Sequence, residues 1–306
     1  MCNEGGKAME NCLTRVEFDI LEFLATEVTD FNMQYLAEKN GYSIDEFENA
    51  MIRLEEFGYI KNGMITADGI NSLEPYRVKR AVFIAAGFGS RMVPITFNTP
   101  KPLVRVHGKR IIDTLLDAVV AAGIEEIVIV RGYLSEQFDQ LLYKYPNIRF
   151  IENPMYNDAN NIGSAMCVRY MLKNAYVLEA DLVLSNPGLV RKYHYCSNFL
   201  GIPMKRSDDW CFRVEEGIIK EQMIGGVNCY QEVGISYWDA DDGAKLAEHI
   251  EKTFKMPGGK ERYWDQVPFA FFPDDYKVEI RPCSMNDIVE IDSFKELKRF
   301  DKLYDV

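Results

Sequence analysis

The stretch 85–103, AAGFGSRMVPITFNTPKPL, holds the residues of this 306-residue chain that are best suited to phosphate chemistry. Two glycines, Gly87 and Gly89, follow an apolar run, and Arg91 and Lys101 come after them. The backbone N–H groups of a glycine turn can face phosphate oxygens, and two cations close in sequence can converge on them. Three prolines stiffen the intervening chain, which lowers the entropic cost of binding a ligand. The sequence therefore predicts a phosphate-binding loop.

This loop matches neither of two common nucleotide-binding signatures. A P-loop needs a lysine directly after its second glycine, where this chain has Ser90. A dinucleotide-binding fingerprint needs a third glycine, where this chain has Met92. The competing interpretation is a surface turn between a strand and a helix with incidental charges, but the glycines, cations and prolines together favour phosphate binding.

Alternating strand and helix patterns surround the loop from residue 80 onwards. Strands are predicted at 81–86, 125–130, 148–152 and 176–181, and helices at 110–123, from about 135 and from about 162. Such alternation predicts an α/β domain with a Rossmann-like, mostly parallel mixed sheet and helices on both faces. Ligands of such sheets bind beyond the carboxyl ends of the strands, and the glycine loop lies at the first of those ends. We assign residues 79–306 to this domain.

A different pattern precedes this domain. Three helical segments are followed by YIKNGMIT, in which Asn62-Gly63 is the turn signal of a two-residue hairpin. The third helix opens with Ser43 and Glu46 at the spacing of a capping box. Three helices and a hairpin resemble a small winged-helix domain, to which we assign residues 1–78.

DNA binding would be the sharpest hypothesis for a winged-helix domain, but its charges argue against it. Residues 1–79 hold seven Lys or Arg and fifteen Asp or Glu, and the third helix is mostly acidic. Phosphate contacts require a basic surface. We therefore expect a docking or regulatory module rather than a DNA reader.

The whole chain has a formal net charge of −12, which repels nucleic acids and anionic membranes. An anionic ligand therefore needs a local basic cluster or a metal ion. No apolar run approaches the roughly 20 residues of a membrane span, and the N-terminus lacks the features of a signal peptide. We expect a cytoplasmic protein with no membrane or DNA partner, and a homo-oligomer is one possible assembly.

The loop also carries a family signature. The patterns G-x-G-[ST]-R, P-x-T and P-K-x-L are all present, at Gly87, Gly89, Ser90, Arg91, Pro94, Thr96, Pro100, Lys101 and Leu103. With these residues the chain resembles the nucleoside-triphosphate transferases, which include the sugar-phosphate nucleotidylyltransferases, from residue 80 to about 303. Within that superfamily it is most similar to the bacterial CTP:phosphocholine cytidylyltransferases, through VRGYLSEQF, YNDANNIGSA, YVLEADLVL, GISYWD, RYWDQV and IVEIDSF.

The resemblance implies a fold of the nucleotide-diphospho-sugar transferase type. It also implies a magnesium-dependent reaction in which CTP and phosphocholine give CDP-choline and pyrophosphate. By the same resemblance, Arg91 and Lys101 hold the triphosphate and act in catalysis. The nucleotide contacts expected on this basis come from Ala85, Ala86, Gly87, Gly89, Ser90, Arg91, Lys101, Asn161 and Ser164.

Two aspartates are expected to hold the magnesium ion. Asp181 ends the strand YVLEAD and Asp292 ends the apolar run IVEID, so both should lie at a sheet edge, and the family's metal-binding aspartates map onto them. Magnesium prefers oxygen ligands, typically one or two carboxylates together with waters and phosphates. For Asp292, which precedes SFKELKRF, a helix N-cap is the competing role and can coexist with metal binding.

The three tryptophans, each next to an aspartate, indicate the acceptor. A quaternary ammonium cannot donate N–H hydrogen bonds, so aromatic faces with nearby carboxylates suit it. Trp238 lies in a strand-like run, and we expect it to pack in the core. The predicted choline-binding residues are Trp210, Tyr263, Trp264 and Asp265, with Glu290 as a further charge partner.

Two other functions stay open. A sugar-1-phosphate nucleotidylyltransferase would share the reaction class, but its acceptor site should offer more amides and hydroxyls. A winged-helix regulator would use the second domain only to sense a nucleotide or a choline compound, and the intact Arg91, Lys101, Asp181 and Asp292 argue against it. Phosphoethanolamine or another small phosphorylated acceptor, and triphosphates other than CTP, are equally compatible with these residues.

Overall fold

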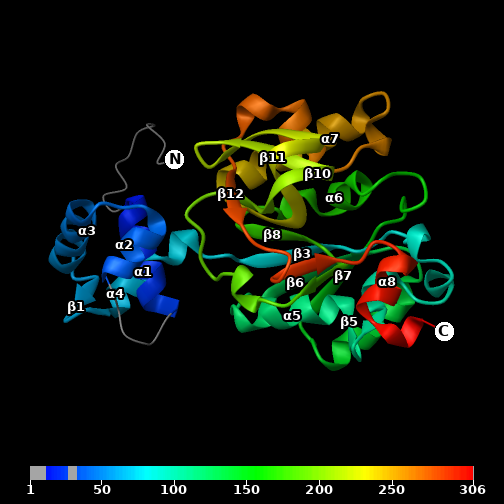
Figure 1. Ribbon diagram of the computed structural model, residues 1–306, viewed down its shortest axis with the longest axis horizontal. Coiled ribbons are helices and arrows are strands. Elements are labelled where there is room, and N and C mark those ends of the chain that lie inside the picture. Colours follow the sequence, from blue (N-terminus) through cyan, green and yellow to red (C-terminus); the bar gives the residue numbers. More distant parts are fainter. Residues whose placement is uncertain (1–11, 27–32, 306) are drawn as a thin grey trace. The chain divides into compact units, whose positions relative to one another are not determined.

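The computed structural model describes residues 12–26 and 33–305, and the chain divides into two compact units, Met1–Arg77 and Val78–Val306 (Figure 1). The elements of the first unit are α1 (Arg15–Thr26), α2 (Met33–Asn40), α3 (Ile44–Glu56), β1 (Ile60–Lys61), β2 (Met64–Ile65) and α4 (Ala67–Ser72). In the described part of the chain, no helix combines the length and the apolar character that crossing a membrane requires.

The first unit contains the three helices and the hairpin that the sequence predicts. Ser43 caps α3, and Glu46 completes the capping box. β1 pairs antiparallel with β2 through Asn62 and Gly63, which both have positive φ, as the favoured two-residue hairpin turn requires. The acidic residues of α3 are exposed. That this unit is a winged helix stays a prediction.

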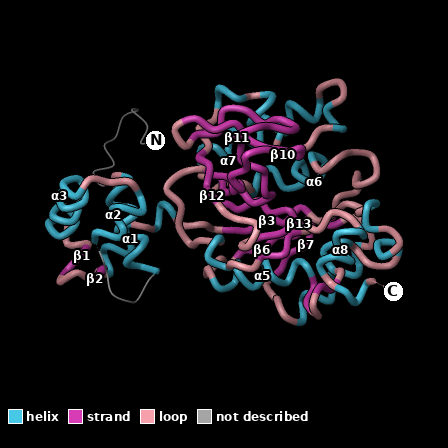
Figure 2. The backbone as a smooth tube through the Cα atoms, viewed as in Figure 1, coloured by secondary structure: helices cyan, strands magenta, loops and turns pink. Residues whose placement is uncertain are grey.

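The second unit is built on a seven-stranded sheet with the order β10-β12-β11-β8-β3-β6-β7 (Figure 2). Its strands are β3 (Arg80–Ile84), β6 (Glu126–Arg131), β7 (Ile148–Glu152), β8 (Ala175–Glu179), β10 (Asn198–Glu215), β11 (Ile218–Trp238) and β12 (Glu279–Pro282). β8, β3, β6 and β7 run parallel, whereas β11 is antiparallel to β8. This mixed, mostly parallel sheet confirms the α/β fold class predicted for residues 79–306.

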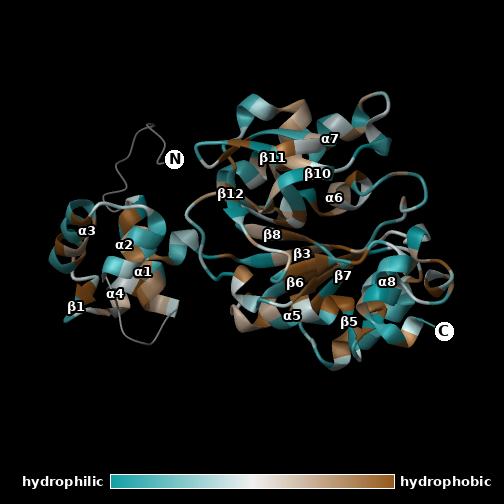
Figure 3. Ribbon diagram, viewed as in Figure 1, coloured by the Kyte–Doolittle hydropathy of each residue, from teal (hydrophilic) through white to brown (hydrophobic). Residues whose placement is uncertain are grey.

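The parallel strands separate two apolar cores. Ala81 and Phe83 of β3 belong to the core beneath α5 (Ile111–Ala121), whereas Val82 belongs to the core beneath α6 (Ile162–Val168) and α7 (Ala240–Lys255). Successive side chains of a strand point to opposite faces, so a strand covered on both faces is apolar throughout. Figure 3 shows these strands as the hydrophobic middle of the unit, between helices.

Smaller elements complete the second unit. They are β4 (Arg105–Val106) paired with β5 (Lys109–Arg110), β9 (Leu182–Leu184) paired with β13 (Ile288–Glu290), and α8 (Phe294–Phe300). In the β9–β13 pair, Leu182 lies opposite Glu290. Because the two strands are antiparallel, this register brings Asp181 and Asp292 to the same end of the pair.

Two segments differ from the sequence expectation. Residues Ser135–Tyr143, where a helix is expected, form a 3₁₀ stretch rather than an α-helix. β8 ends at Glu179, so Asp181 lies in the turn that follows the strand and does not end it. The turn leaves the Asp181 carboxylate outside the strand ladder, beyond the carboxyl end of the sheet.

Candidate active site

A cavity of about 710 Å³ opens beyond the carboxyl ends of β3 and β8. It is lined by the glycine loop, the β8–β9 turn, the loop before α6, the β10–β11 hairpin and the segment around β13. The predicted site residues that line it are Ala85, Ala86, Gly87, Gly89, Ser90, Arg91, Lys101, Asn161, Ser164, Asp181, Trp210, Tyr263, Asp265, Glu290 and Asp292. The fold therefore brings together every predicted site residue except Trp264, although their individual roles stay predictions.

The glycine loop is shaped around Lys101. Gly89 has a φ of 68°, in the left-handed region that favours glycine. A Cβ at this position would lie 3.1 Å from Cβ of Lys101 and 3.3 Å from Cγ2 of Thr96. Thr96 also donates a hydrogen bond from Oγ1 to the carbonyl of Gly89, at 3.0 Å. Glycine here lets the lysine side chain pass close to the turn on its way to the cavity.

Lys101 links the two predicted metal ligands. Its side chain is largely buried, and its Nζ lies 2.7 Å from Oδ2 of Asp181 and 2.8 Å from Oδ1 of Asp292. Arg91 forms a second ion pair with Asp292, at 2.8 Å. Burial disfavours the charged ammonium, but attraction to the two carboxylates outweighs it, so the pKa of Lys101 is raised. The predicted cations and the predicted metal ligands thus form one charged cluster.

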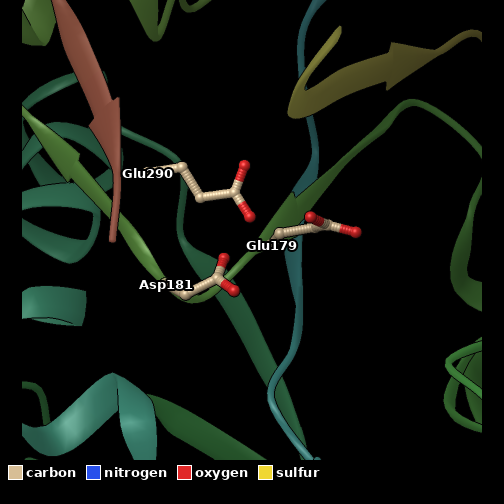
Figure 4. Close-up of side chains that lie close together, drawn as sticks. All are labelled: Glu179, Asp181 and Glu290. Atoms are coloured by element: carbon tan, nitrogen blue, oxygen red, sulfur yellow. The ribbon is translucent and has the colours of Figure 1, made fainter. Parts of the chain in front are cut away.

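Three carboxylates of the cavity lie close enough to share a cation (Figure 4). One carboxylate oxygen from each of Glu179, Asp181 and Glu290 lies within 4.8 Å of the other two. Burial and the neighbouring carboxylates raise the pKa of Glu179 to about 8 and that of Glu290 to about 10. Oδ1 of Asp181 is buried without a hydrogen-bond partner among the described residues. An unpartnered oxygen among mutually repelling carboxylates fits a divalent cation.

Asp292 is not the helix N-cap, which is the competing role that its sequence position allows. Ser293, not Asp292, is the N-cap of α8, and Glu296 completes a capping box with it. The carboxylate of Asp292 therefore does not cap the helix, and it faces Lys101 and Arg91 instead. This orientation keeps Asp292 available for the cavity.

Asn161 and Ser164 line the cavity on the side of α6, and both have protein partners. Oγ of Ser164 accepts a hydrogen bond from Nδ2 of Asn153 at 3.0 Å. Oδ1 of Asn161 accepts one from the backbone N–H of Trp264 at 2.9 Å, and its Nδ2 donates to Oε1 of Glu179 at 3.4 Å. Asn161 therefore ties the loop before α6 to the loop that carries the acceptor residues. Its contact with the nucleotide stays a prediction.

The predicted choline site is formed only in part. The rings of Trp210 and Tyr263 both line the cavity, with centroids 5.7 Å apart and an interplanar angle of 66°. Trp264 is only 2% exposed and packs against Phe199 and Trp238 in the core under α7. The expectation that Trp264 forms a wall of this site is therefore corrected. Trp238 is buried in the same core, as predicted.

Three further carboxylates of the cavity, Glu179, Asp209 and Glu232, are not among the residues predicted from the sequence. Glu179 stands two residues before Asp181, as Glu290 stands two residues before Asp292. This repeated Glu-x-Asp pattern after a strand is a signal by which Glu179 could have been found. Glu232 lies within the long strand β11, where nothing in the local sequence distinguishes it from a solvent-exposed residue.

Comparison with known proteins identifies the family of this chain. Residues 80–193, which include the glycine loop, Lys101 and Asp181, match the family described as nucleotidyl transferase. The chain is 36% identical over 232 residues to the 2-aminoethylphosphonate cytidylyltransferase of Lancefieldella rimae, covering 73% of this chain and 92% of that relative. It is 31% identical over 234 residues to the choline-phosphate cytidylyltransferase of Streptococcus pneumoniae, covering 73% of this chain and 97% of that relative.

A solved structure shares the fold as well. The CTP:phosphocholine cytidylyltransferase from Streptococcus pneumoniae superposes with a TM-score of 0.68 at 30% identity, covering 74% of this chain and 99% of that one. These relatives are matched over nearly their full length. The chain therefore belongs to the nucleotidyl transferase family and, within it, to the cytidylyltransferases.

Proposed function

We propose that this protein transfers CMP from CTP to a small acceptor that carries a phosphate or phosphonate at one end and a cationic amine at the other. The observation that carries the proposal is that two sets of side chains with different contacts line one cavity. Arg91 and Lys101 pair with Asp181 and Asp292 beside the glycine loop. Trp210 and Tyr263 contact each other, and Glu232 and Asp265 share one hydrogen-bond donor; we take this second set as the acceptor end. A dianionic group and a cationic group on one small molecule complement the two sets.

In the proposed reaction, an oxygen of the acceptor's phosphate or phosphonate attacks the α-phosphorus of CTP. A new P–O bond forms there, the bond from the α-phosphorus to the bridging oxygen breaks, and pyrophosphate leaves with that electron pair. Lys101 and Arg91 stabilise the negative charge that develops on the phosphate oxygens. A phosphomonoester needs no general base, because its second pKa is about 6 and it is already ionised.

Magnesium fits the carboxylate cluster described above, and Asp181 and Asp292 are the residues proposed to hold it, with Glu179 and Glu290 beside them. When bound, the ion would neutralise phosphate charge and align the reacting groups. The protein supplies the oxygen ligands, and Lys101 supplies a fixed cation next to them.

Two acceptors are candidates. Phosphocholine, the acceptor predicted from the sequence, is supported by the aromatic pair of Trp210 and Tyr263 and by the name of the relative from Streptococcus pneumoniae. 2-Aminoethylphosphonate, named in another relative, is supported by the carboxyl groups of Glu232 and Asp265, which also line the cavity. A sugar 1-phosphate carries no cation to balance the buried carboxyl groups, so we place it third.

A pyrophosphate-release assay tests the proposal. CTP, UTP, GTP and ATP are each combined with phosphocholine, phosphoethanolamine, 2-aminoethylphosphonate and glucose 1-phosphate in the presence of Mg²⁺. We expect the highest turnover with CTP and an acceptor that carries an amine. Turnover that is highest with glucose 1-phosphate, or absent with every combination, would contradict the proposed function.

A further inference from the structure

At the acceptor end of the cavity, one glutamine joins two carboxyl groups. Nε2 of Gln222 lies 2.8 Å from Oε2 of Glu232 and 2.6 Å from Oδ2 of Asp265. Gln222 and Glu232 belong to β11, whereas Asp265 lies in the loop after α7. A side-chain amide has two N–H donors, so Gln222 can hold both carboxyl groups side by side. We call Gln222, Glu232 and Asp265 the carboxyl clamp.

The carboxyl clamp carries negative charge that the protein does not neutralise. Glu232 and Asp265 line the cavity, and no Lys or Arg in the described part of the chain forms an ion pair with either. The lining cations, Arg91 and Lys101, pair with the metal-side aspartates instead. Burial raises the pKa of both carboxyl groups, and the hydrogen bond between them raises that of Glu232 further and lowers that of Asp265. A cation bound beside the pair would offset the cost of burying these two groups.

A protonated primary amine suits this end of the cavity better than a quaternary amine. Its N–H groups can donate to oxygens of Glu232 and Asp265, whereas a trimethylammonium has no N–H donor and depends on aromatic faces. Only two of the three aromatic residues expected to enclose the amine, Trp210 and Tyr263, line the cavity. A trimethylammonium beside the clamp would leave buried carboxyl oxygens without a donor, which weakens binding.

On the basis of the proposed function, we propose that the carboxyl clamp recognises the acceptor's amine and selects a primary ammonium over a trimethylammonium. Glu232 and Asp265 contact the amine. Gln222, which is not among the residues that line the cavity, is a positioning residue that sets the spacing of the two carboxyl groups. The selectivity in kcat/KM should be about tenfold or more, the worth of one hydrogen bond to a charged group.

The first experiment compares acceptors that differ only in N-methylation, with the full-length protein and CTP. Phosphoethanolamine and phosphocholine form one matched pair, and 2-aminoethylphosphonate and its N,N,N-trimethyl derivative form another. A kcat/KM about tenfold or more higher for the primary amine, in the pair that is turned over, supports the proposal. An equal or higher kcat/KM for the trimethylated member overturns it and leaves the proposed function intact. Absence of turnover with all four acceptors overturns the proposed function itself, and the selectivity with it.

The second experiment tests the clamp residues by substitution. It measures the ratio of kcat/KM for the primary amine to kcat/KM for its trimethylated counterpart. Gln222→Leu and Glu232→Leu should each reduce the preference for the primary amine by about tenfold, while the KM for CTP stays unchanged. Glu232→Gln should retain most of the preference, because an amide can still donate to Asp265. Gln231→Leu, a neighbouring substitution whose side chain does not line the cavity, is the matched control and should keep the ratio.

A clamp that served only the fold would give a different result. Gln222→Leu and Glu232→Leu would then lower the melting temperature and leave the ratio between the two members of a pair at its wild-type value. That outcome overturns the proposal. Circular dichroism of each variant identifies any that fails to fold, and the comparison of acceptors with the wild-type protein decides the question independently of them.

Discussion

The ammonium of Lys101 lies 2.7 Å from the carboxylate of Asp181, and this contact joins the glycine loop after β3 to the turn after β8. Both partners are more than three-quarters buried, so neither can lose the other without leaving a poorly solvated charge. The same ammonium reaches Asp292, which brings a third segment of the chain to this point. The ion pairs of Lys101 with Asp181 and Asp292 therefore hold the three segments together, and the shape of the cavity depends on them.

Asp181→Asn keeps the shape of the side chain and removes its charge. We expect turnover to fall by about 100-fold or more, because the substitution removes a proposed magnesium ligand and one partner of Lys101. Steady-state assays over a range of Mg²⁺ concentrations measure the effect. Asp274→Asn, an exposed substitution outside the cavity, is the matched control. Near-normal turnover of the Asp181 variant, at the wild-type Mg²⁺ requirement, would show that the metal assignment is wrong.

Trp210→Ala removes one of the two aromatic rings that line the acceptor end. A desolvated contact between a cation and an aromatic face contributes about 2 kcal/mol, so the KM for the acceptor should rise about tenfold or more. The KM for CTP should change little, because the proposed triphosphate contacts lie at the other end of the cavity. An unchanged acceptor KM would mean that this ring does not touch the amine.

Trp264→Ala should act on stability and not on acceptor binding. Removing a large, buried aromatic side chain costs about 3–5 kcal/mol of the free energy of unfolding. Thermal melting of the variant should therefore shift downward by roughly 10 °C. If the variant melts like the wild type but has a raised acceptor KM, Trp264 belongs to the acceptor site and its burial in the core is the wrong explanation.

The stability of the metal-free protein should decrease as the pH rises. The pKa of Glu179 is raised from 4.5 to about 8 by burial and nearby carboxylates, so the folded state holds this proton more tightly than the unfolded state. Its stabilising contribution is present below about pH 4.5 and is lost as the pH rises to about 8. Glu179→Gln cannot lose a proton, so its melting temperature should fall less than that of the wild type over this interval.

The measurement of this pH effect is thermal melting in EDTA at several pH values. Glu248→Gln, on the exposed face of α7, should follow the wild-type curve. Parallel curves for the wild type and Glu179→Gln would show that Glu179 ionises normally in the folded protein.

The full-length protein should not bind duplex DNA appreciably at physiological salt. The first unit is acidic, and the acidic side chains of α3 are exposed where a DNA reader needs Lys and Arg. Proteins that bind DNA without sequence preference usually have dissociation constants of about 10⁻⁴ to 10⁻⁶ M. A gel shift with a micromolar dissociation constant that weakens as salt is added would contradict this prediction. It would support the alternative function of a winged-helix regulator.

The glycine loop, the two cations and the two aspartates could be predicted because each is tied to the end of a strand. Parallel strands bring their carboxyl ends to one edge of the sheet, so the loop after β3, which carries Lys101, meets Asp181 after β8. The antiparallel β9–β13 pair then brings Asp292 to the same place, although it is far away in the chain. The apolar runs and the glycines that follow them were sufficient to predict β3, α5 and β6. The helix expected from residue 135 has the correct apolar spacing, but spacing alone does not distinguish a 3₁₀ stretch from an α-helix.

The acceptor end could be predicted less well, because its residues are positioned by long-range packing. Tyr263 and Asp265 line the cavity, whereas Trp264 between them points into the core, and adjacency in the sequence does not show this alternation. Gln222 and Glu232 are ten residues apart on β11, and they meet where the pairing with β10 is irregular and Phe212 lies opposite both Gln222 and Tyr230. Polar residues in a long strand look like a solvent-exposed face until the cavity beside them is known.

β11 serves two purposes along its 21 residues. Its last residues, Ile235 to Trp238, pair with β8 in the central sheet, whereas Gln222 and Glu232 come before them in the strand and hold the acceptor end. The glycine loop and the metal-side aspartates come from other segments. Evolution or an enzyme engineer can therefore exchange one amine for another by altering β11 before Ile235, while the residues proposed to bind CTP stay unchanged.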